Sequence, residues 1–258
     1  MSARQRLDER LVADALAESR TRAQALIRAG RVLVDDVPVD KPGTRVADHA
    51  KLRLRGEDRR YVSRGGEKLA AALDDLGVDP RGRICLDLGA STGGFTDCLL
   101  QAGASRVLAV DVGWGQLDWR LRDDPRVSVM ERTNARYLVA SELAATPSLV
   151  VVDVSFISVR LLLPTLAREL PNCELLVMVK PQFEVGKGQV GKGGVVRDPV
   201  LRAAAADRVA ACGAELGWDP VGRADCRLAG PKGNREIFVR FLPRSAEDLT
   251  AGIAAPHK

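Results

Sequence analysis

The sequence predicts an α/β protein in which helices cover both faces of a mostly parallel sheet, with a small α+β module before it. From residue 63 onward, strand-like apolar segments alternate with helical segments. The strand segments are nearly continuous runs of Val, Ile and Leu, which is typical of parallel strands buried on both faces. The first sixty residues instead contain two short helical segments followed by short strands. The chain of 258 residues suffices for one large domain or two small ones, and the change of pattern favours two.

The N-terminal module, residues 1–58, begins with two predicted helices. The first spans residues 6–16, and its apolar face consists of Leu7, Leu11, Val12 and Leu16. The second begins at a capping box formed by Thr21 and Gln24 and ends at Gly30. Short strands are predicted at Arg31–Asp35, Val37–Val39 and Lys51–Arg55, with turns at Asp35-Asp36 and Lys41-Pro42-Gly43. Residues 59–62 form a connector.

The larger domain, residues 63–258, alternates the two kinds of element. Its predicted strands are Ile84–Leu88, Val107–Val112, Val127–Met130, Leu149–Val154, Leu175–Lys180 and Ile237–Leu242. Its predicted helices are Glu67–Leu76, Gly94–Ala102, Val159–Glu169 with an interruption at Pro164, and Leu201–Leu216. From Ser245 onward we expect a frayed end.

The composition excludes several classes of protein. No stretch approaches eighteen consecutive apolar residues, so no membrane-spanning helix is expected. The polar first ten residues lack the apolar run of a signal peptide, so we expect a cytoplasmic protein. The five cysteines form no C-x-x-C pair and the two histidines are isolated. The sequence therefore contains no motif for a metal site and favours buried, reduced thiols.

Positive charge is concentrated in the first quarter of the chain. Residues 1–60 carry fourteen Lys or Arg against ten Asp or Glu, whereas the remainder carries twenty-five against twenty-four. A local basic surplus favours a polyanionic partner, and nucleic acid comes first. The predicted phosphate contacts of the N-terminal module are Arg4, Arg6, Arg20, Arg22 and Lys41. The alternative for each of them is an ordinary solvated surface charge.

A glycine-rich segment, DLGASTGGF, lies where a predicted strand meets a predicted helix. Glycine lets the backbone turn sharply and approach a ligand, and amides at a helix N-terminus can bind a polar or anionic group. The glycine intervals differ from the dinucleotide fingerprint, and no Gly-Lys-Ser/Thr follows as in a Walker loop. The alternative is a tight turn without a ligand. The predicted cofactor-binding residues of this segment are Asp87, Gly89, Ala90, Ser91, Thr92, Gly93 and Phe95.

The next two strand ends strengthen this interpretation. Asp111 ends the second strand, twenty-two residues beyond Gly89, where an acidic side chain can accept both ribose hydroxyls of an adenosine. Asn134 follows the third strand, where the adenine edge would lie. The alternative for Asp111 is an ordinary strand-end turn residue. The arrangement resembles the Rossmann-like methyltransferases that bind S-adenosylmethionine.

Charged residues also close the fourth and fifth strands. Asp153 and Lys180 follow very apolar segments, and the carboxyl ends of parallel strands line one crevice of an open sheet. We therefore expect both side chains to meet the cofactor there. The alternative is a structural ion pair without a catalytic role.

Four residues carry a closer resemblance. Lys68, Asp153, Lys180 and Glu236 match, in this order, the Lys-Asp-Lys-Glu tetrad of FtsJ-type RNA 2′-O-ribose methyltransferases. The first sixty residues resemble the RNA-binding domain of small-subunit ribosomal protein S-four. With the motifs GASTGGF, VDVSFIS, VKPQFEVGKGQVG and GNREIF, about residues 4–242 resemble the TlyA family. Its members are rRNA (cytidine-2′-O)-methyltransferases that are often named haemolysins.

The resemblance implies a catalytic role for these four residues, S-adenosylmethionine as cofactor, and ribosomal RNA or ribosomal subunits as partner, without a membrane partner and with a monomer favoured. Transfer to a ribose hydroxyl needs positioning and removal of the 2′-OH proton. An ordinary lysine, with a pKa of about 10.4, is almost wholly charged at pH 7. Lys180 is therefore either a base with a suppressed charge or a charged orienter that stabilises negative charge on the ribose oxygen.

The other functions weighed against this one lack sequence support. Methylation of an amine typically uses an Asn/Asp-Pro-Pro-aromatic strand end, and carbon-five methylation a Cys nucleophile, but Asp153 is followed by Val-Ser-Phe. A non-catalytic RNA-binding protein would not need the tetrad. A pore-forming haemolysin is disfavoured because the sequence contains no spanning segment.

Further RNA contacts are predicted after the fifth strand. The glycine-rich segment 186–194 carries Lys187 and Lys192 and is placed to close on a substrate, although a merely floppy loop is the alternative. Tyr61, Phe156 and Phe183 are aromatic residues that could stack on a base drawn out of a helix. For Phe156 we expect core packing instead.

Overall fold

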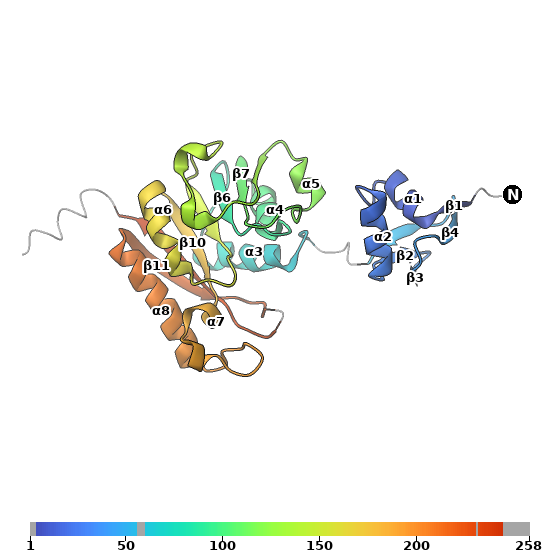
Figure 1. Ribbon diagram of the computed structural model, residues 1–258. Coiled ribbons are helices and arrows are strands. Elements are labelled where there is room, and N and C mark those ends of the chain that lie inside the picture. The colour runs from blue at the N-terminus through green and yellow to red at the C-terminus, as the bar shows by residue number, and fades with distance from the viewer. Residues whose placement is uncertain (1–3, 56–59, 231, 245–258) are drawn as a thin grey trace, which may run out of the picture. The chain divides into compact units, whose positions relative to one another are not determined.

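The computed structural model describes residues 4–55, 60–230 and 232–244, and the chain divides into two units, Met1–Arg59 and Arg60–Lys258. Figure 1 shows the first unit in shades of blue and the second in colours from cyan to red. The expected frayed end from Ser245 lies outside the described residues. No helix in the described segments is long and apolar enough to cross a membrane.

The first unit packs two short helices against small antiparallel sheets. The helices are α1 (Leu7–Ala13) and α2 (Arg20–Arg28). One sheet has the order β3-β2-β5, from Val37–Val39, Val32–Val34 and Leu52–Leu54. The other pairs β1 (Arg4–Arg6) with β4 (Arg45–Ala47). The sequence predicted the three-stranded sheet but not this pair, because segments of three residues that contain arginines show no apolar pattern.

Two details of the predicted helices are wrong. The apolar face of α1 contains buried Leu7 and Leu11, but Val12 is exposed and the helix ends before Leu16. The N-cap of α2 is Ser19, whose hydroxyl accepts from the amide of Arg22 at 3.2 Å, and not Thr21. The side chain of Gln24 is directed to Asp8 instead of to a capping box. The predicted end of the helix is confirmed, since Gly30 follows it with a φ of +65°.

The second unit contains one seven-stranded sheet with the order β11-β12-β10-β9-β6-β7-β8. The strands are β6 (Ile84–Leu88), β7 (Arg106–Val110), β8 (Val127–Met130), β9 (Leu149–Val152), β10 (Glu174–Val179), β11 (Trp218–Asp225) and β12 (Ile237–Pro243). The first five are parallel, and β12 runs antiparallel to both β10 and β11. The prediction of a mostly parallel sheet is thus confirmed. The prediction missed β11, because its outward positions are polar and it contains Pro220 and Gly222.

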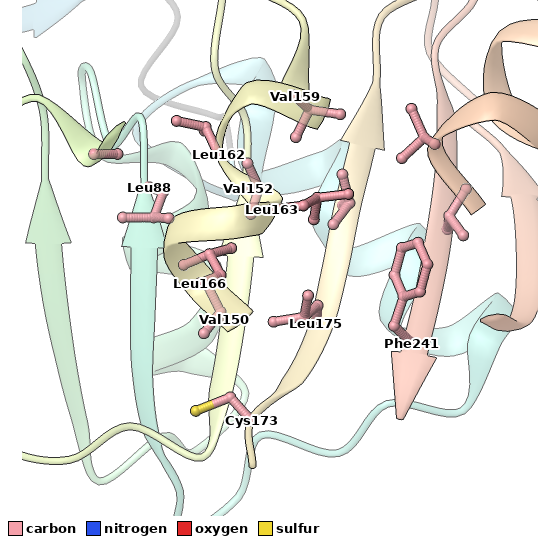
Figure 2. Close-up of a cluster of buried hydrophobic side chains, with 14 of the residues drawn as sticks. Leu88, Val150, Val152, Val159, Leu162, Leu163, Leu166, Cys173, Leu175 and Phe241 are labelled. Atoms are coloured by element: carbon pink, nitrogen blue, oxygen red, sulfur yellow. The ribbon is translucent and has the colours of Figure 1, made fainter. Parts of the chain in front are cut away.

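Helices cover both faces of this sheet, as predicted. The helices are α3 (Arg64–Leu76), α4 (Gly94–Gln101), α5 (Trp119–Arg122), α6 (Leu163–Glu169), α7 (Pro181–Glu184) and α8 (Pro199–Glu215). Alternate strand residues form two separate cores: Leu88, Val152 and Val177 pack with α6 and α8, whereas Cys85, Val151 and Met178 pack with α3 and α4. Figure 2 shows the first core, where Leu162, Leu163 and Leu166 lie over Val150, Val152 and Leu175.

The carboxyl ends of the parallel strands therefore point to one edge of the sheet. The single-turn helix η3 (Val159–Leu161) precedes α6, so the predicted helix over Val159–Glu169 is broken before Pro164. Because β12 is antiparallel, its first residue meets the last residues of β10 at this same edge, as the pairing of Ile237 with Val179 shows. Residues distant in the sequence thus converge where a parallel sheet places its ligands.

Candidate active site at the carboxyl ends of the parallel strands

Two ion pairs stand at this edge of the sheet, and together they contain all four predicted catalytic residues. The ammonium nitrogen Nζ of Lys68 lies 3.2 Å from Oε2 of Glu236. The Nζ of Lys180 lies 2.5 Å from Oδ1 of Asp153. Lys180 follows Val179 and Glu236 precedes Ile237, and Val179 and Ile237 are directly paired in the sheet. The two pairs therefore share one neighbourhood.

Lys68 is buried on the first turns of α3, and glycines bring that helix into place. The N-cap of α3 is Ser63, whose hydroxyl accepts from the amide of Gly65. A Cβ at Gly66 would lie 2.8 Å from the carbonyl oxygen of Gly94, and a Cβ at Gly94 would lie 2.9 Å from the amide nitrogen of Gly66. The first turns of α3 and α4 thus touch through their backbones. This contact carries Lys68 beside the glycine-rich segment that opens α4.

Glu236 is buried at the start of β12 and shielded by a turn. A Cβ on Gly230 would lie 2.5 Å from Oε1 of Glu236, so a larger residue there would displace the carboxylate. The turn is closed by hydrogen bonds from Gly230 N to Asn234 O and from Cys226 N to Glu236 O. The carboxylate is therefore fixed by its backbone as well as by Lys68.

The Lys180–Asp153 pair lies against the glycine-rich segment. Lys180 follows β10 and also donates to Oγ of Ser155 at 2.7 Å. Gly89, which has a φ of +90°, lies so near that a Cβ on it would be 2.5 Å from the carbonyl oxygen of Asp153. No other residue type fits this backbone conformation and this approach without strain. The glycine-rich segment and the tetrad therefore form one continuous site.

Asp87 is the most deeply buried acidic residue of the predicted cofactor-binding set. Its Oδ2 accepts from the hydroxyl of Thr96 at 2.7 Å, while Oδ1 has no hydrogen-bond partner. Burial raises the pKa of Asp87 to about 7, and the negative charges of Asp153 and Asp111 act in the same direction. A buried carboxylate oxygen without a donor is costly, so this site is suited to a cationic or donor group.

Asp111 links the two neighbouring loops. Its Oδ2 accepts from the amide of Ser91 at 2.8 Å, and its Oδ1 accepts from the amide of Gly113 at 2.6 Å. Each carboxylate oxygen still has a second lone pair. Asn134 stands after β8, where its side chain caps the single turn η1 (Ala135–Tyr137).

The other predicted loop residues differ in exposure. Ser91 and Thr92 are exposed, whereas Ala90 and Gly93 are buried, and Gly93 is the N-cap of α4, with a φ of +95°. Phe95 is packed in the core, with its ring 6.1 Å from that of Phe238. The backbone of the segment thus faces the site, while its phenylalanine anchors α4.

Phe156 is not in the core, contrary to expectation. It is 89% exposed and has a φ of +71°, a conformation that costs about 1–3 kcal/mol in a residue with a side chain. Its ring lies 5.8 Å from that of Phe183. Tyr61 is instead buried in the core, and burial raises its pKa to about 12. The packing of Tyr61 excludes it from stacking on a base at the surface.

The glycine-rich segment 186–194 is anchored at its far end. Asn234 accepts from the amide of Val196 at 3.0 Å and donates to the carbonyl oxygen of Gly194 at 2.8 Å. An isolated bridge joins Gly191 to Val195. Lys192 is exposed, and the side chain of Lys187 lies outside the described part of the chain. The segment is therefore tied to the turn that carries Glu236.

In the first unit, a buried carboxylate gathers two of the predicted phosphate contacts. Asp8 is fully buried and accepts from Nε and Nη2 of Arg6, from Nε of Arg20 and from Gln24, each at 2.9–3.0 Å. These donors hold the pKa of Asp8 well below its usual range, the hydrogen bond from Arg6 contributing most. Arg4 and Arg22 are exposed on β1 and on the first turn of α2, and Lys41 is exposed after β3.

The sequence missed three residues of the site. Ser155 holds Lys180, Thr96 holds Asp87, and Gly230 makes room for Glu236. Ser155 and Thr96 are near recognised motif residues in the sequence and could have been included on that ground. Nothing in the sequence distinguishes Gly230 from the other 23 glycines. No group of three or more His, Cys, Asp or Glu side chains among the described residues could hold a metal ion.

Comparisons with known proteins match both units. The FtsJ-like methyltransferase family matches residues 61–241, and the S4 domain family matches residues 5–51. The chain is 49% identical to the 16S/23S rRNA (cytidine-2′-O)-methyltransferase TlyA of Mycobacterium tuberculosis, over 97% of this chain and 94% of that protein. It is 41% identical to Hemolysin A of Brachyspira hyodysenteriae, over 92% and 99% of the two chains.

A solved structure agrees over nearly the whole chain. A protein of Streptococcus thermophilus named as a candidate hemolysin is 38% identical and has a TM-score of 0.71, covering 95% of this chain and 90% of that one. The family match to the second unit extends from Tyr61 into β12 and so includes both ion pairs. The chain therefore belongs to the TlyA family of methyltransferases, in which an S4 domain precedes an FtsJ-like methyltransferase domain.

Proposed function

We propose that this chain transfers a methyl group from S-adenosylmethionine to the 2′-hydroxyl of a cytidine in ribosomal RNA. The observation that carries the proposal is the meeting of two ion pairs, Lys68–Glu236 and Lys180–Asp153, beside a glycine-rich loop. The TlyA relative from Mycobacterium tuberculosis, named for this reaction on 16S and 23S rRNA, supports the substrate class.

The residues around the glycine-rich loop fit this cofactor. The partnerless Oδ1 of Asp87 matches the ammonium group of the methionine part. The backbone of Gly89, Ala90, Ser91, Thr92 and Gly93 would hold the methionine carboxylate and sulfur region, with Phe95 behind it. Asp111 would bind the ribose hydroxyls and Asn134 would lie at the adenine edge, with Asp153 beside the transferred group. When bound, S-adenosylmethionine supplies an electrophilic methyl group on a sulfonium.

The chain's own residues then orient the ribose oxygen. Oδ1 of Asp153 lies 2.5 Å from the Lys180 nitrogen, and from this ion pair we assign Lys180 the role of a charged orienter. Its ammonium donates to the 2′-oxygen and stabilises the negative charge that develops there, and the proton of the 2′-hydroxyl passes to solvent water. Asp153 and Ser155 orient the Lys180 side chain by direct contacts with its ammonium group. The buried Lys68–Glu236 pair lies on the neighbouring side of the site.

RNA capture falls to the basic residues outside the tetrad. We assign docking to residues 1–58, chemistry to residues 63–258 and their spacing to the connector 59–62. Arg4, Arg6, Arg20, Arg22 and Lys41 would contact phosphates in the first part, and Lys187 and Lys192 in the second. Phosphate contacts position the RNA without reading its sequence.

The exposed aromatic pair supplies a place for the target base. Phe156 follows Asp153 by three residues, and Phe183 follows Lys180 by three. Their rings are in contact, and the ring of Phe156 is nearly fully open to solvent. A base drawn out of an RNA helix can stack on such a ring, which would bring its ribose toward Lys180.

Replacing Lys180 tests the assignment. We expect Lys180→Ala to abolish methyl transfer to ribosomal subunits while RNA and cofactor affinities change by less than about threefold. Lys51→Ala, at an exposed lysine of the first unit, is the matched control and should retain activity. The readout is the mapping of 2′-O-methyl sites in rRNA after single-turnover reactions. A Lys180→Ala variant that transfers methyl groups at the wild-type rate would overturn the assignment.

A further inference from the structure

Glu184 is a buried carboxylate that none of the proposed roles uses. It ends α7, the single helical turn that follows Lys180, and is 5% exposed. Its Oε2 accepts from the Ser158 hydroxyl at 2.6 Å and from Nε of Arg160 at 3.1 Å, and its Oε1 accepts from the amide of Val159 at 2.7 Å. It thus caps η3 from a different element.

These bonds join the two segments that carry the chemistry. One segment runs from Asp153 at the end of β9 to Arg160, and the other runs from Lys180 at the end of β10 to Glu184. Lys180 ties their first residues together through Asp153 and Ser155. Glu184 ties their last residues together, and its own carbonyl oxygen accepts from Arg208 of α8 at 3.3 Å. Glu184 therefore connects the Asp153 segment, through its carboxylate, to a long helix of the core, through its carbonyl oxygen.

Phe156 lies between these two points of attachment. Its φ of +71° is unfavourable for a residue with a side chain and persists only where the surroundings determine it. Its exposed ring has few contacts that could do so, the neighbouring ring of Phe183 being the one the structure shows. The constraint must therefore come through the backbone on either side. Ser155 is held on the N-terminal side by Lys180, and Ser158 and Val159 are held on the C-terminal side by Glu184.

We infer that Glu184 is a positioning residue that holds Phe156 in its exposed, left-handed conformation and so presents the ring to the target base. This inference rests on the proposed function, because it needs a base to be presented. Glu184 touches neither substrate nor cofactor. Its effect reaches the reaction through Phe156, and its removal lets residues 154–158 relax to ordinary backbone angles.

A double-mutant cycle between Glu184 and Phe156 tests this. Glu184→Gln keeps the size and one acceptor oxygen but removes the charge that pairs with Arg160. We expect it to lower the single-turnover methylation rate on ribosomal subunits at least tenfold, with cofactor and RNA affinities within about threefold. In a Phe156→Ala background, the same substitution should change the rate less than twofold, because the ring it positions is gone.

Glu169 provides a matched control. Its Oε2 accepts from the amide of Ala140, which opens the short helix η2 (Ala140–Glu142), and its Oε1 pairs with Arg168 at 2.8 Å. The local chemistry is that of Glu184, but Glu169 stands at the end of α6 that leads into β10, away from Lys180. Glu169→Gln should leave the methylation rate unchanged. Thermal unfolding of each variant verifies that the rates are those of folded protein.

The outcomes separate the inference from the proposed function. If the effects of Glu184→Gln and Phe156→Ala multiply, or if Glu184→Gln leaves the rate unchanged, the positioning role is wrong. Should Glu184→Gln prove unfolded at the assay temperature, Arg160→Gln, which removes the partner of the same carboxylate, takes its place in the same cycle with the same criteria. If wild-type protein transfers no methyl group, the proposed function itself fails. If wild type is active, Lys180→Ala is inactive and the cycle is non-additive as stated, both hold.

Discussion

At the scale of a single residue, Asp87 couples cofactor binding to pH, because its carboxylate oxygen Oδ1 has no hydrogen-bond partner within the protein. The folded chain raises the pKa of Asp87 to about 7, above the ordinary value near 4. In the unfolded chain the carboxyl loses its proton near pH 4, whereas the folded chain keeps the proton up to about pH 7. The cofactor-free protein therefore loses stability as pH rises from 4 to 7, by roughly 4 kcal/mol for a shift of three units.

A first prediction follows for cofactor affinity. The ammonium of S-adenosylmethionine favours the charged carboxylate, so the dissociation constant should rise by up to about tenfold per pH unit below pH 7 and be level above it. Asp87→Asn should bind more weakly at pH 8 and should lose this pH dependence. Calorimetric titrations of both proteins between pH 5.5 and 8.5 measure it. A pH dependence that is equal in both proteins would show that another group titrates.

A second prediction at this scale concerns the glycine contact beneath Lys68. Gly66→Ala adds a Cβ that would lie 2.3 Å from Cγ of Tyr61 and 2.8 Å from the carbonyl oxygen of Gly94. We expect it to lower the free energy of unfolding by about 1–3 kcal/mol, the usual cost of overpacking, and to slow methyl transfer by displacing α3. Gly188→Ala is the control for stability, since no atom lies within 4 Å of the added Cβ. Urea unfolding of the two variants should separate them clearly.

At the scale of the elements, a cluster of charged side chains joins β6, β10 and β12 near the end of the sheet opposite the candidate active site. Glu174, the first residue of β10, pairs with Arg83 at 2.6 Å and with Arg240 of β12 at 2.7 Å. Arg240 also donates to the carbonyl oxygen of Leu76, which ends α3. The cluster thus fixes the start of β10 and the end of α3 together.

Removing its central carboxylate should be costly. Glu174→Ala leaves two half-buried guanidinium groups without their partner, and we expect a loss of about 3 kcal/mol, the low end for a broken buried pair. Chemical unfolding at pH 7 measures the loss. Asp207→Ala, which breaks the exposed pair with Arg223, is the control and should cost less than about 1 kcal/mol. Equal effects of the two substitutions would contradict the structural role of Glu174.

The sequence predicted the elements whose pattern is repeated over several residues, and it missed those held by contacts from elsewhere. The buried strands β6 to β10 and the helices α3, α4, α6 and α8 were predicted because their apolar residues recur with a clear period, whereas the single turns α5 and α7 were not predicted. The edge strand β11 and the pair β1-β4 show no such period, since their positions are stabilised by their neighbours. In the site, Lys68, Asp153, Lys180 and Glu236 were identified through a family motif. The exposure of Phe156 was not, because an aromatic residue in an apolar sequence is ordinarily buried.

At the scale of the whole molecule, we expect the positive charge of the first unit to set the salt dependence of RNA binding. Arg6 and Arg20 are tied to buried Asp8, so their removal would also leave that carboxylate without partners. Arg4 and Arg22 test the phosphate contacts more cleanly. Replacing each by Ala should reduce the slope of the logarithm of the RNA association constant against the logarithm of salt concentration by roughly 0.7–0.9 per lost contact.

Arg28→Ala, on the last turn of α2, is the control for this prediction and should leave the salt dependence as it is. Filter binding to ribosomal subunits over a range of salt concentrations gives the slopes. Single-turnover rates at saturating RNA should stay within about twofold of wild type in all three variants, because the tetrad is intact. An unchanged slope in the Arg4 and Arg22 variants would assign RNA docking to another surface.

The ion pair between Lys68 and Glu236 joins residues that are 168 positions apart in the chain. This separation determines at which stage of folding the candidate active site is completed. Contacts so far apart in sequence form only after the cost of closing a long loop has been met, and so they form late in folding. Helix α3 and the first strands can assemble as soon as they are synthesised, but Lys68 then has no counter-charge. Its partner arrives only when the antiparallel β12 has been inserted at the edge of β10. Since the proposed target is ribosomal RNA, a nascent chain emerging from a ribosome would acquire a complete site only after its last strand has joined the sheet.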